Sequence, residues 1–181
     1  MNFAIVGATG NVGRKTIDIL EKSKLKINNL FLVASKKSAG KKISFKSKII
    51  TIESLENYDF SRANITFFAA GSAIAKKWAP IAAKETIVID NSNNFRMDKN
   101  ISLVVPEVNE SALKNYKKTN IIANPNCSTT QLVVALKPLH DKFKIKRIVV
   151  STYQAVSGAG KVSTDELFSQ TKDFLNGKKI K

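Results

Sequence analysis

Cysteine and histidine are almost absent from this 181-residue sequence, which contains one of each, Cys127 and His140. A single cysteine cannot form a disulfide within the chain, so we expect a reducing, cytoplasmic environment. Runs of about 18 or more apolar residues are also missing, and the sequence therefore predicts no membrane-spanning helix. Residues 1–6 lead directly into a glycine loop, without the basic and apolar regions of a signal peptide. The sequence thus argues against a disulfide-stabilised secreted domain and against an integral membrane protein.

Acidic residues are scarce as well, with 14 Asp and Glu against 30 Lys and Arg, which gives a net charge of +16. Such a balance raises the question of a nucleic-acid partner. Only four of the basic residues are arginines, however, and the lysines are spread along the chain without an Arg-rich stripe interleaved with aromatics. We interpret the excess as solvated surface, part of which favours phosphate-bearing ligands, and predict no nucleic-acid partner.

Short apolar runs alternate with helical patterns over most of the chain. Strands are predicted at residues 3–6, 30–34, 48–52, 65–70, 86–90, 103–105 and 120–123, and helices at 11–22, 72–84 and 110–116. This alternation favours an α/β fold, a doubly wound parallel sheet of the Rossmann type with helices on both faces. We assign residues 1–126 to a dinucleotide-binding domain.

Residues 127–181 are predicted to begin a second domain. A helix starts at residue 127, alternation over 144–154 predicts a long strand, residues 155–160 form a glycine loop, and residues 161–175 predict a helix. We expect the apolar residues 148–150 to be exposed and to promote association.

The glycine loop Gly7-Ala8-Thr9-Gly10-Asn11-Val12-Gly13 lies between the first predicted strand and the first predicted helix. In this position, glycines allow a tight turn and a close approach of the backbone to a pyrophosphate, which binds at the helix N-terminus. The spacing G-x-x-G-x-x-G differs from the commoner G-x-G-x-x-G, and a ligand-free turn is the alternative.

The second predicted strand is followed by Ser35-Lys36-Lys37-Ser38. An acidic residue near this place accepts the ribose hydroxyls in NAD-binding domains, and none is present here. Two lysines and two serines can hold a 2′-phosphate, so NADP is favoured over NAD. A solvated basic turn is the alternative.

Cys127 stands where a predicted strand gives way to a helical pattern. Unpaired backbone N–H groups and the helix dipole stabilise a thiolate at a helix N-terminus, which suits a nucleophile. A small buried thiol is the alternative. Parallel strands bring the residues that follow them to one edge of the sheet. We expect five such positions to share one crevice: Gly7, Ser35, Gly71, Asn91 and Cys127.

His140 follows Cys127 by 13 residues on the same predicted helix. At about 1.5 Å rise per residue this is roughly 20 Å along the axis, which is beyond hydrogen-bond reach. Pro138 can bend or end the helix but does not return His140 to the first turn. We therefore interpret His140 as a surface residue and expect the general base that a nucleophilic cysteine needs to be missing from this chain.

Six motifs occur in order along the chain: GATGNVG (7–13), ASKKSAG (34–40), VIDNSNNFRM (88–97), LVVPEVN (103–109), NPNCSTTQ (124–131) and STYQAVSGAG (151–160). Together they resemble aspartate-semialdehyde dehydrogenase over essentially the whole chain. The cysteine motif differs from the Pro-Gly-Cys-Tyr-Pro-Thr of N-acetyl-γ-glutamyl-phosphate reductases, which are the nearest alternative. It also differs from the Ser-Cys-Thr-Thr-Asn of glyceraldehyde-phosphate dehydrogenase.

The resemblance implies an NADP-dependent enzyme of lysine, threonine and methionine biosynthesis, a homodimer whose second domain is catalytic and dimerising. In the reversible reaction, the Cys127 thiolate adds to the aldehyde of aspartate semialdehyde, oxidation gives an acyl thioester, and phosphate releases aspartyl phosphate. By the same resemblance, Arg96 holds the phosphate, where a guanidinium can bind two oxygens at once. Gln154 orients the substrate and Asn126 lines the same site. No metal is implied.

The resemblance also implies cofactor contacts. Those to the pyrophosphate are made by the glycine loop, those to the 2′-phosphate by the segment after the second strand, and the others by two further loops. The residues concerned are Gly7, Thr9, Gly10, Asn11, Val12, Gly13, Ser35, Lys37, Ser38, Gly71, Ser72, Ser157 and Gly158.

The chain departs from the family pattern in three places. Lys37 stands where the family has arginine, which keeps the charge but loses the planar fork. Ser92-Asn93 replaces Ser-Ser or Thr-Ser. Family members continue well beyond residue 181, and that part carries the histidine acid/base and a second substrate-binding arginine. We therefore expect no significant dehydrogenase activity from this chain alone; an inactive NADP-binding fragment or remnant is the alternative function.

Overall fold

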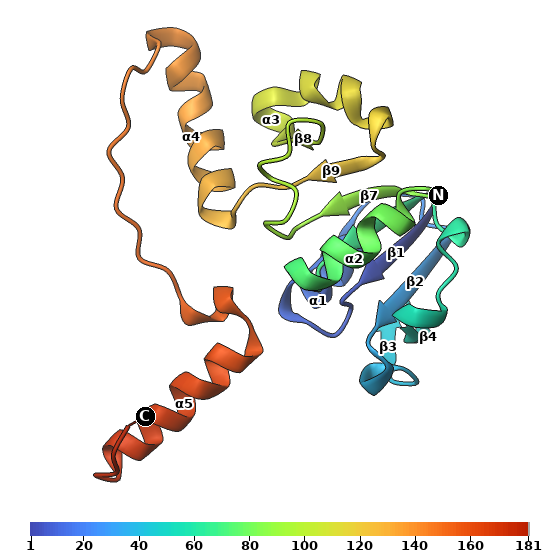
Figure 1. Cartoon of the computed structure of the whole chain (residues 1–181), viewed down its shortest axis with the longest axis vertical. Helices are drawn as coiled ribbons and strands as arrows, with labels where there is room; N and C mark the ends of the chain where they lie inside the picture. The colour runs from blue at the N-terminus through green and yellow to red at the C-terminus, as the bar shows by residue number, and fades with distance from the viewer. Residues whose placement is uncertain (181) are drawn as a thin grey trace. The chain divides into compact units, whose positions relative to one another are not determined.

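The structure is a computed structural model that describes residues 1–180 and forms two compact units, Met1–Arg147 and Ile148–Lys181. A seven-stranded sheet, in the order β5-β2-β1-β6-β7-β9-β8, forms the centre of the first unit, and all neighbouring strands in it are parallel (Figure 1). Its strands are β1 (Asn2–Val6), β2 (Asn29–Ala34), β5 (Glu53–Ser54), β6 (Ile65–Phe68), β7 (Ile87–Asp90), β8 (Ser102–Leu103) and β9 (Ile121–Ala123). The predicted doubly wound parallel sheet is confirmed.

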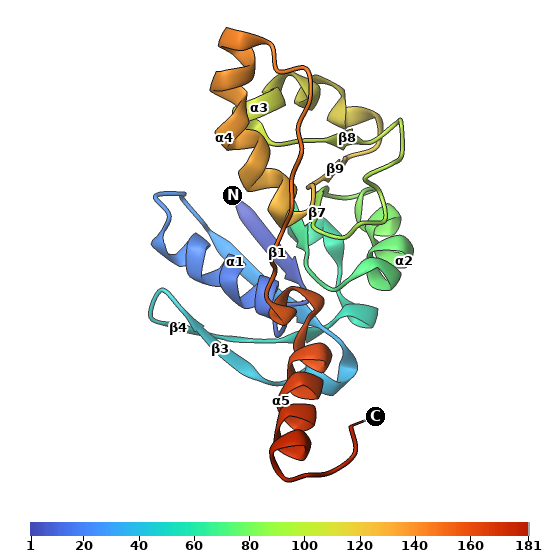
Figure 2. The same ribbon diagram turned by 90° about the vertical axis from the view of Figure 1, so that its left-hand side faces the viewer.

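Helices α1 (Asn11–Lys22) and α2 (Ser72–Ala82) lie on opposite faces of this sheet (Figure 2). Because successive side chains of a strand point to opposite faces, a strand can contribute residues to the hydrophobic clusters on both faces of the sheet. Phe3 and Ile5 of β1 join the cluster that contains Ile17 and Leu20 of α1. The alternate residues of the same strand, Ala4 and Val6, join the cluster that contains the alanines of α2.

A two-stranded antiparallel hairpin, β3 (Lys42–Phe45) and β4 (Lys48–Thr51), forms a separate sheet. The predicted strand at 48–52 is therefore present but does not belong to the parallel sheet. The turn of the hairpin places Lys46 and Ser47 at φ values of 45° and 65°. Hairpin turns with positive φ usually contain Asn-Gly or a similar pair, so this Lys-Ser turn gave no sequence signal for β3.

The chain between β8 and β9 forms a short helix, α3 (Pro106–Asn109), followed by a 3₁₀ helix, η4 (Glu110–Lys118). The α-helix predicted at 110–116 is thus a 3₁₀ helix. The backbone of Asn109 is not helical (φ −143°, ψ 43°), which separates the two segments. Its side chain accepts a hydrogen bond from the Val105 N–H (2.8 Å) and donates one to the Leu103 carbonyl (2.9 Å), so it is tied to the chain before α3. After β9, helix α4 (Cys127–Phe143) continues through Pro138.

The second unit contains a short 3₁₀ helix, η5 (Val156–Ala159), and helix α5 (Lys161–Leu175). Helix α5 has the bounds that the sequence predicted. The long strand predicted at 144–154 is wrong: this segment has no regular structure, and no strand of the described residues pairs with it. Alternation alone does not make a strand, since its backbone N–H and C=O groups need a neighbouring strand. The exposure expected for residues 148–150 is confirmed, at 53%, 84% and 55%.

The chain divides after Arg147 into two compact units, and this division does not test the domain boundary expected after residue 126. That boundary remains a prediction. None of the described helices is long and apolar enough to cross a membrane.

Candidate dinucleotide site and cysteine loop

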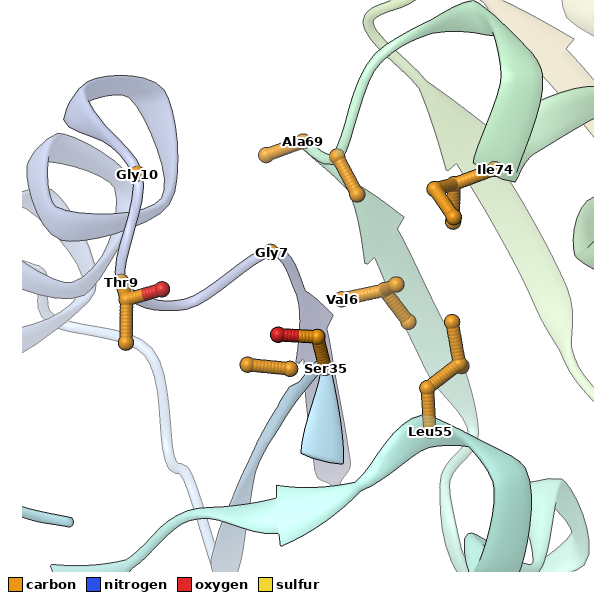
Figure 3. A pocket seen from close by; sticks show the side chains of 10 residues that line it. Val6, Gly7, Thr9, Gly10, Ser35, Leu55, Ala69 and Ile74 are labelled. Atoms are coloured by element: carbon orange, nitrogen blue, oxygen red, sulfur yellow. The ribbon is translucent and has the colours of Figure 1, made fainter. Parts of the chain in front are cut away.

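A cavity of about 330 Å³ lies at the carboxyl ends of β1, β2 and β6 (Figure 3). It is lined by Val6, Gly7, Thr9, Gly10, Ala34, Ser35, Leu55, Ala69, Ala70 and Ile74. Figure 3 shows the hydroxyl groups of Thr9 and Ser35 turned toward the space between the strand ends. This is the position in which open α/β sheets bind their ligands. Of the five strand-end residues expected to share one crevice, Gly7 and Ser35 line this cavity, whereas Gly71, Asn91 and Cys127 do not.

Two glycines of the loop between β1 and α1 are fixed by backbone contacts. Gly7 has φ +89°, and a Cβ atom built there would stand 2.6 Å from the Ala69 carbonyl oxygen. A Cβ atom on Gly13 would stand 2.2 Å from the Gly7 carbonyl oxygen. The first turn of α1 is thus pressed against the loop, which explains why both positions need glycine.

The N-terminus of α1 is open to a ligand. Gly10, in extended conformation, is its N-cap, and no side chain within residues 1–180 caps the first turn. The backbone N–H groups of such a turn lack partners inside the helix and carry the positive end of its dipole. The residues present, which include Asn11, Val12 and Gly13, therefore fit a pyrophosphate.

The segment that follows β2 is a short 3₁₀ helix, η1 (Lys36–Ser38), with Ser35 as its N-cap. Lys37 is exposed and Ser38 half-buried, and Lys37 makes no ion pair with any described residue. A free lysine and two hydroxyl groups next to the cavity fit an additional phosphate group. The structure is thus consistent with the expected 2′-phosphate contacts, which remain a prediction.

The N-terminus of α2 is the second helix end near this edge of the sheet. Gly71, with φ +82°, is its N-cap and adds no side chain to cap the helix. The Ser72 hydroxyl donates to the Asn93 side-chain oxygen, which ties α2 to the loop after β7. Ile74, two residues after Ser72, lines the cavity, whereas Gly71 and Ser72 lie outside its lining.

Arg96 connects the loops that follow β7 and β9. Its Nε–H donates to the Asn124 carbonyl (2.8 Å), and an Nη2–H donates to the Asn91 carbonyl (3.1 Å). The side-chain amide of Asn124 in turn donates to Asn91 Oδ1 (2.7 Å). A guanidinium carries five N–H donors, so several remain for a ligand. This network holds Arg96 beside the segment that leads from Asn124 to Cys127.

Asp90, the last residue of β7, is fully buried at the base of this network. One carboxyl oxygen accepts from the Ser92 hydroxyl (2.6 Å), and the other has no hydrogen-bond partner among the described residues. Burial raises the pKa of the Asp90 carboxyl above its ordinary value, and the Ser92 hydrogen bonds and the Arg96 charge offset this rise only in part.

Asp90 should therefore make stability depend on pH. Because its pKa is raised by folding, the folded state keeps the proton after the unfolded state has lost it. Its contribution to stability is greatest below the unfolded pKa of about 3.9 and falls as pH rises through the folded pKa. Relative to wild type, Asp90→Asn should gain unfolding free energy between pH 4 and pH 7 in urea titrations. Asp98→Asn, an exposed carboxyl on the same loop, controls for the lost charge, and a pH-independent difference for Asp90→Asn would contradict this account.

Cys127 is the first residue of α4 and is exposed, so the alternative of a buried thiol is wrong. Asn126 caps the helix: its side-chain oxygen accepts from the Ser128 N–H (2.9 Å) and lies 3.9 Å from the Cys127 sulfur. His140 lies in the last turn of the same uninterrupted helix, as the sequence predicted. The helix therefore holds the histidine away from the thiol. In the described part of the chain, no group of three or more His, Cys, Asp or Glu side chains could hold a metal ion.

Gln154, Ser157 and Gly158 belong to the second unit and are described by themselves. All three are exposed; the Gln154 amide donates to the Thr152 hydroxyl (3.3 Å), and Ser157 and Gly158 lie within η5. Their membership of one site with Cys127 remains a prediction.

Two parts of the site, Asn124 and Asp90, were not predicted from the sequence. Asn124 directly follows β9, and Asn91 directly follows the neighbouring strand β7. Two asparagines after adjacent parallel strands are a signal that could have paired them. The apolar side of the cavity, formed by Leu55, Ala69 and Ile74, gave no such signal because apolar residues after strands are common.

Known proteins are similar to most of this chain in sequence. Residues 2–116 match the family described as semialdehyde dehydrogenase, NAD binding domain, and residues 136–181 match the semialdehyde dehydrogenase, dimerisation domain. Aspartate-semialdehyde dehydrogenase 2 of Vibrio cholerae is 50% identical over 177 residues, which are 97% of this chain and 52% of that protein. The chain thus spans about half the length of the curated relatives that it matches.

Solved structures are similar as well. The crystal structure of aspartate semialdehyde dehydrogenase II from Vibrio cholerae, complexed with ASA, has a TM-score of 0.94 and 48% identity. The match covers 99% of this chain and 54% of that one. Aspartate semialdehyde dehydrogenase with NADP from Candida albicans has a TM-score of 0.62 and 28% identity, covering 80% and 48% of the two chains.

Proposed function

Since this chain belongs to the semialdehyde dehydrogenase family and is 50% identical to an aspartate-semialdehyde dehydrogenase, we propose that it forms the NADP-binding and nucleophile-bearing part of such an enzyme. The resemblance that its motifs predicted is confirmed. The observation that carries this proposal is the position of Cys127. It is exposed at the start of α4, on the segment that begins at Asn124, and the Asn124 carbonyl accepts a hydrogen bond from Arg96.

We propose NADP as the cofactor, held between the N-terminus of α1 and the segment after β2. The residues of the chain fit this group: the glycine loop leaves the helix N–H groups open, and Lys37 is free for the 2′-phosphate. The NADP complex of the Candida albicans relative supports this choice. Lysine provides charge without the two-pronged contact of arginine. When bound, NADP supplies the hydride acceptor that aldehyde oxidation requires.

The Cys127 thiolate attacks the aldehyde carbon of aspartate semialdehyde and forms a carbon–sulfur bond. Oxidation of the resulting hemithioacetal leaves an acyl thioester on Cys127. An oxygen of inorganic phosphate then attacks the acyl carbon, the carbon–sulfur bond breaks, and aspartyl phosphate leaves with the thiolate restored. The reverse sequence is a reductive dephosphorylation, which we propose as the biosynthetic direction, toward lysine, threonine and methionine.

The remaining roles follow from the positions of the side chains. Arg96, oriented by two backbone carbonyls, is proposed to bind the phosphate with its remaining N–H donors. Asn126 fixes the first turn of α4, and Gln154 of the second unit is proposed to orient the substrate. The acid/base is proposed to lie outside this chain, because α4 separates its histidine from the thiol.

A homodimer is part of the proposal, supported by the match of residues 136–181 to a dimerisation domain. So is a cytoplasmic location, since the chemistry requires Cys127 to remain a free thiol. An inactive NADP-binding fragment and an N-acetyl-γ-glutamyl-phosphate reductase are the alternatives.

The test uses the chain alone and a chimera in which the remainder of the Vibrio cholerae relative follows residue 181. We expect the chain alone to bind NADP without significant turnover, and the chimera to reduce NADP with aspartate semialdehyde and phosphate. Turnover by the chain alone would show that its acid/base is present. A chimera that acts on N-acetyl-γ-glutamyl semialdehyde instead would favour the reductase, and one that binds NADP without any turnover would favour the fragment.

A further inference from the structure

An ion pair stands directly beyond the cofactor cavity. Strands β2 and β5 are parallel neighbours, with Ala34 opposite Ser54, and the residues that follow them, Ser35 and Leu55, both line the cavity. One residue further along each segment, Lys36 Nζ and a carboxyl oxygen of Glu56 are 3.2 Å apart. The pair therefore bridges η1 and η2 (Leu55–Asn57) at the side of the cavity where the second strand ends.

Glu56 is the acidic group available to this segment. The other acidic residues nearby in sequence have different partners. Glu53 accepts two hydrogen bonds from the Arg62 guanidinium (2.7 and 3.1 Å), and Asp59 accepts from the N–H and hydroxyl of Ser61 (2.9 and 2.7 Å). The segment 35–41 contains no acidic residue of its own. In NAD-binding domains, a carboxylate near the end of the second strand accepts the ribose hydroxyls.

We propose that Glu56, held by Lys36, sets the preference of this site between NADP and NAD. While Lys36 neutralises it, the carboxylate does not repel a 2′-phosphate on the ribose. Released from Lys36, it repels the phosphate and can instead accept hydrogen bonds from ribose hydroxyls, as NAD provides. The inference rests on the proposed function of the site as a dinucleotide site.

We expect the protein to fold without this ion pair, so that the effect of the pair on cofactor affinity can be measured on folded variants. Its side chains are 77% and 58% exposed, and ion pairs of this kind contribute little to stability. Charges in water that lie several ångströms from a doubly charged phosphate nevertheless change its binding several-fold at moderate salt. Changes at either residue should therefore alter cofactor affinity and leave the fold intact.

The experiment measures the dissociation constants of the 181-residue chain for NADP and NAD by titration calorimetry. Lys36→Met removes a positive charge and releases Glu56, so NADP should bind about tenfold more weakly while NAD binds at least as tightly as before. Glu56→Gln releases Lys36, so NADP should bind about threefold more tightly with NAD changed less than about twofold. A merely structural role would shift both cofactors in the same direction.

Lys84→Met and Glu85→Gln are matched controls, because these exposed residues lie after α2 at the opposite, amino-terminal edge of the strands. They should leave the ratio of the two constants unchanged. If wild type prefers NADP and neither Lys36→Met nor Glu56→Gln changes the ratio beyond the controls, the inference is wrong and the proposed function stands. If wild type binds neither dinucleotide, the proposed cofactor is wrong and the inference fails with it.

Discussion

Gly13→Ala should destabilise the first unit by about 3 kcal/mol and abolish binding of NADP. The new methyl group would meet the Gly7 carbonyl oxygen at 2.2 Å, and a backbone atom in a tight loop cannot move aside as a flexible side chain would. Alanine gains up to about 1 kcal/mol from its helix propensity, which is smaller than the clash. Moving the helix away to relieve the contact would displace the N–H groups that face the pyrophosphate.

Urea unfolding followed by the fluorescence of Trp78 measures this effect. Trp78 is the only tryptophan, and it packs against the hydrophobic core of the first unit. Gly10→Ala is the matched control in the same loop, since its Cβ would stand 3.4 Å from the same Gly7 oxygen, an ordinary contact. If the two variants have equal stability, the close approach of α1 to the loop is not what fixes Gly13.

Cys127→Ser should reduce the dehydrogenase activity of the chimera by at least about a thousandfold, as removal of a catalytic nucleophile does. The serine hydroxyl is nearly isosteric but is not ionised near neutral pH, so it is a poor nucleophile without an activating base. Binding of NADP should change less than about twofold, because Cys127 lies outside the cavity lining.

The control for this variant is Thr129→Ala, an exposed position on the same first turns of α4. It should keep most of the activity. Substantial activity in Cys127→Ser would remove the thioester from the proposed mechanism. Loss of NADP binding would instead indicate that the segment from Asn124 to Cys127 supports the fold of the cofactor site.

Much of the first unit could be predicted from the sequence, because its elements carry their own local signals. Helix α1 begins and ends at the predicted residues 11 and 22, since a glycine loop precedes it and its apolar positions repeat at helical spacing. The four inner strands β1, β2, β6 and β7 are mostly apolar runs, as expected for strands that are buried on both faces, whereas β5 (Glu53–Ser54) is polar and was not predicted. Because the carboxyl ends of parallel strands meet at one edge of the sheet, the sequence also predicted that Gly7 and Ser35 lie together, and both line the cavity.

Other features depend on partners that the sequence does not show. The segment 144–154 has the alternation of a strand, but only a neighbouring strand turns alternation into a sheet. The hairpin β3–β4 turns at two residues without the usual glycine or asparagine signal. In the site, the anchoring of Arg96 by carbonyls of Asn91 and Asn124 is a backbone interaction, which side-chain identities cannot reveal.

Strand β1 lies inside the sheet, between β2 and β6, although it precedes both of them in the chain. Asn2 is joined to residues far along the sequence: its N–H donates to the Asn64 side chain (2.7 Å), and its amide donates to the Arg62 carbonyl (3.0 Å). During synthesis, therefore, β1 cannot complete its pairing until β6 has followed it from the ribosome. Parallel pairings of this sequence separation form slowly and leave strand edges exposed meanwhile. The nascent chain is accordingly most exposed to aggregation and to chaperone binding while residues 1 to about 68 emerge, before the dinucleotide cavity exists.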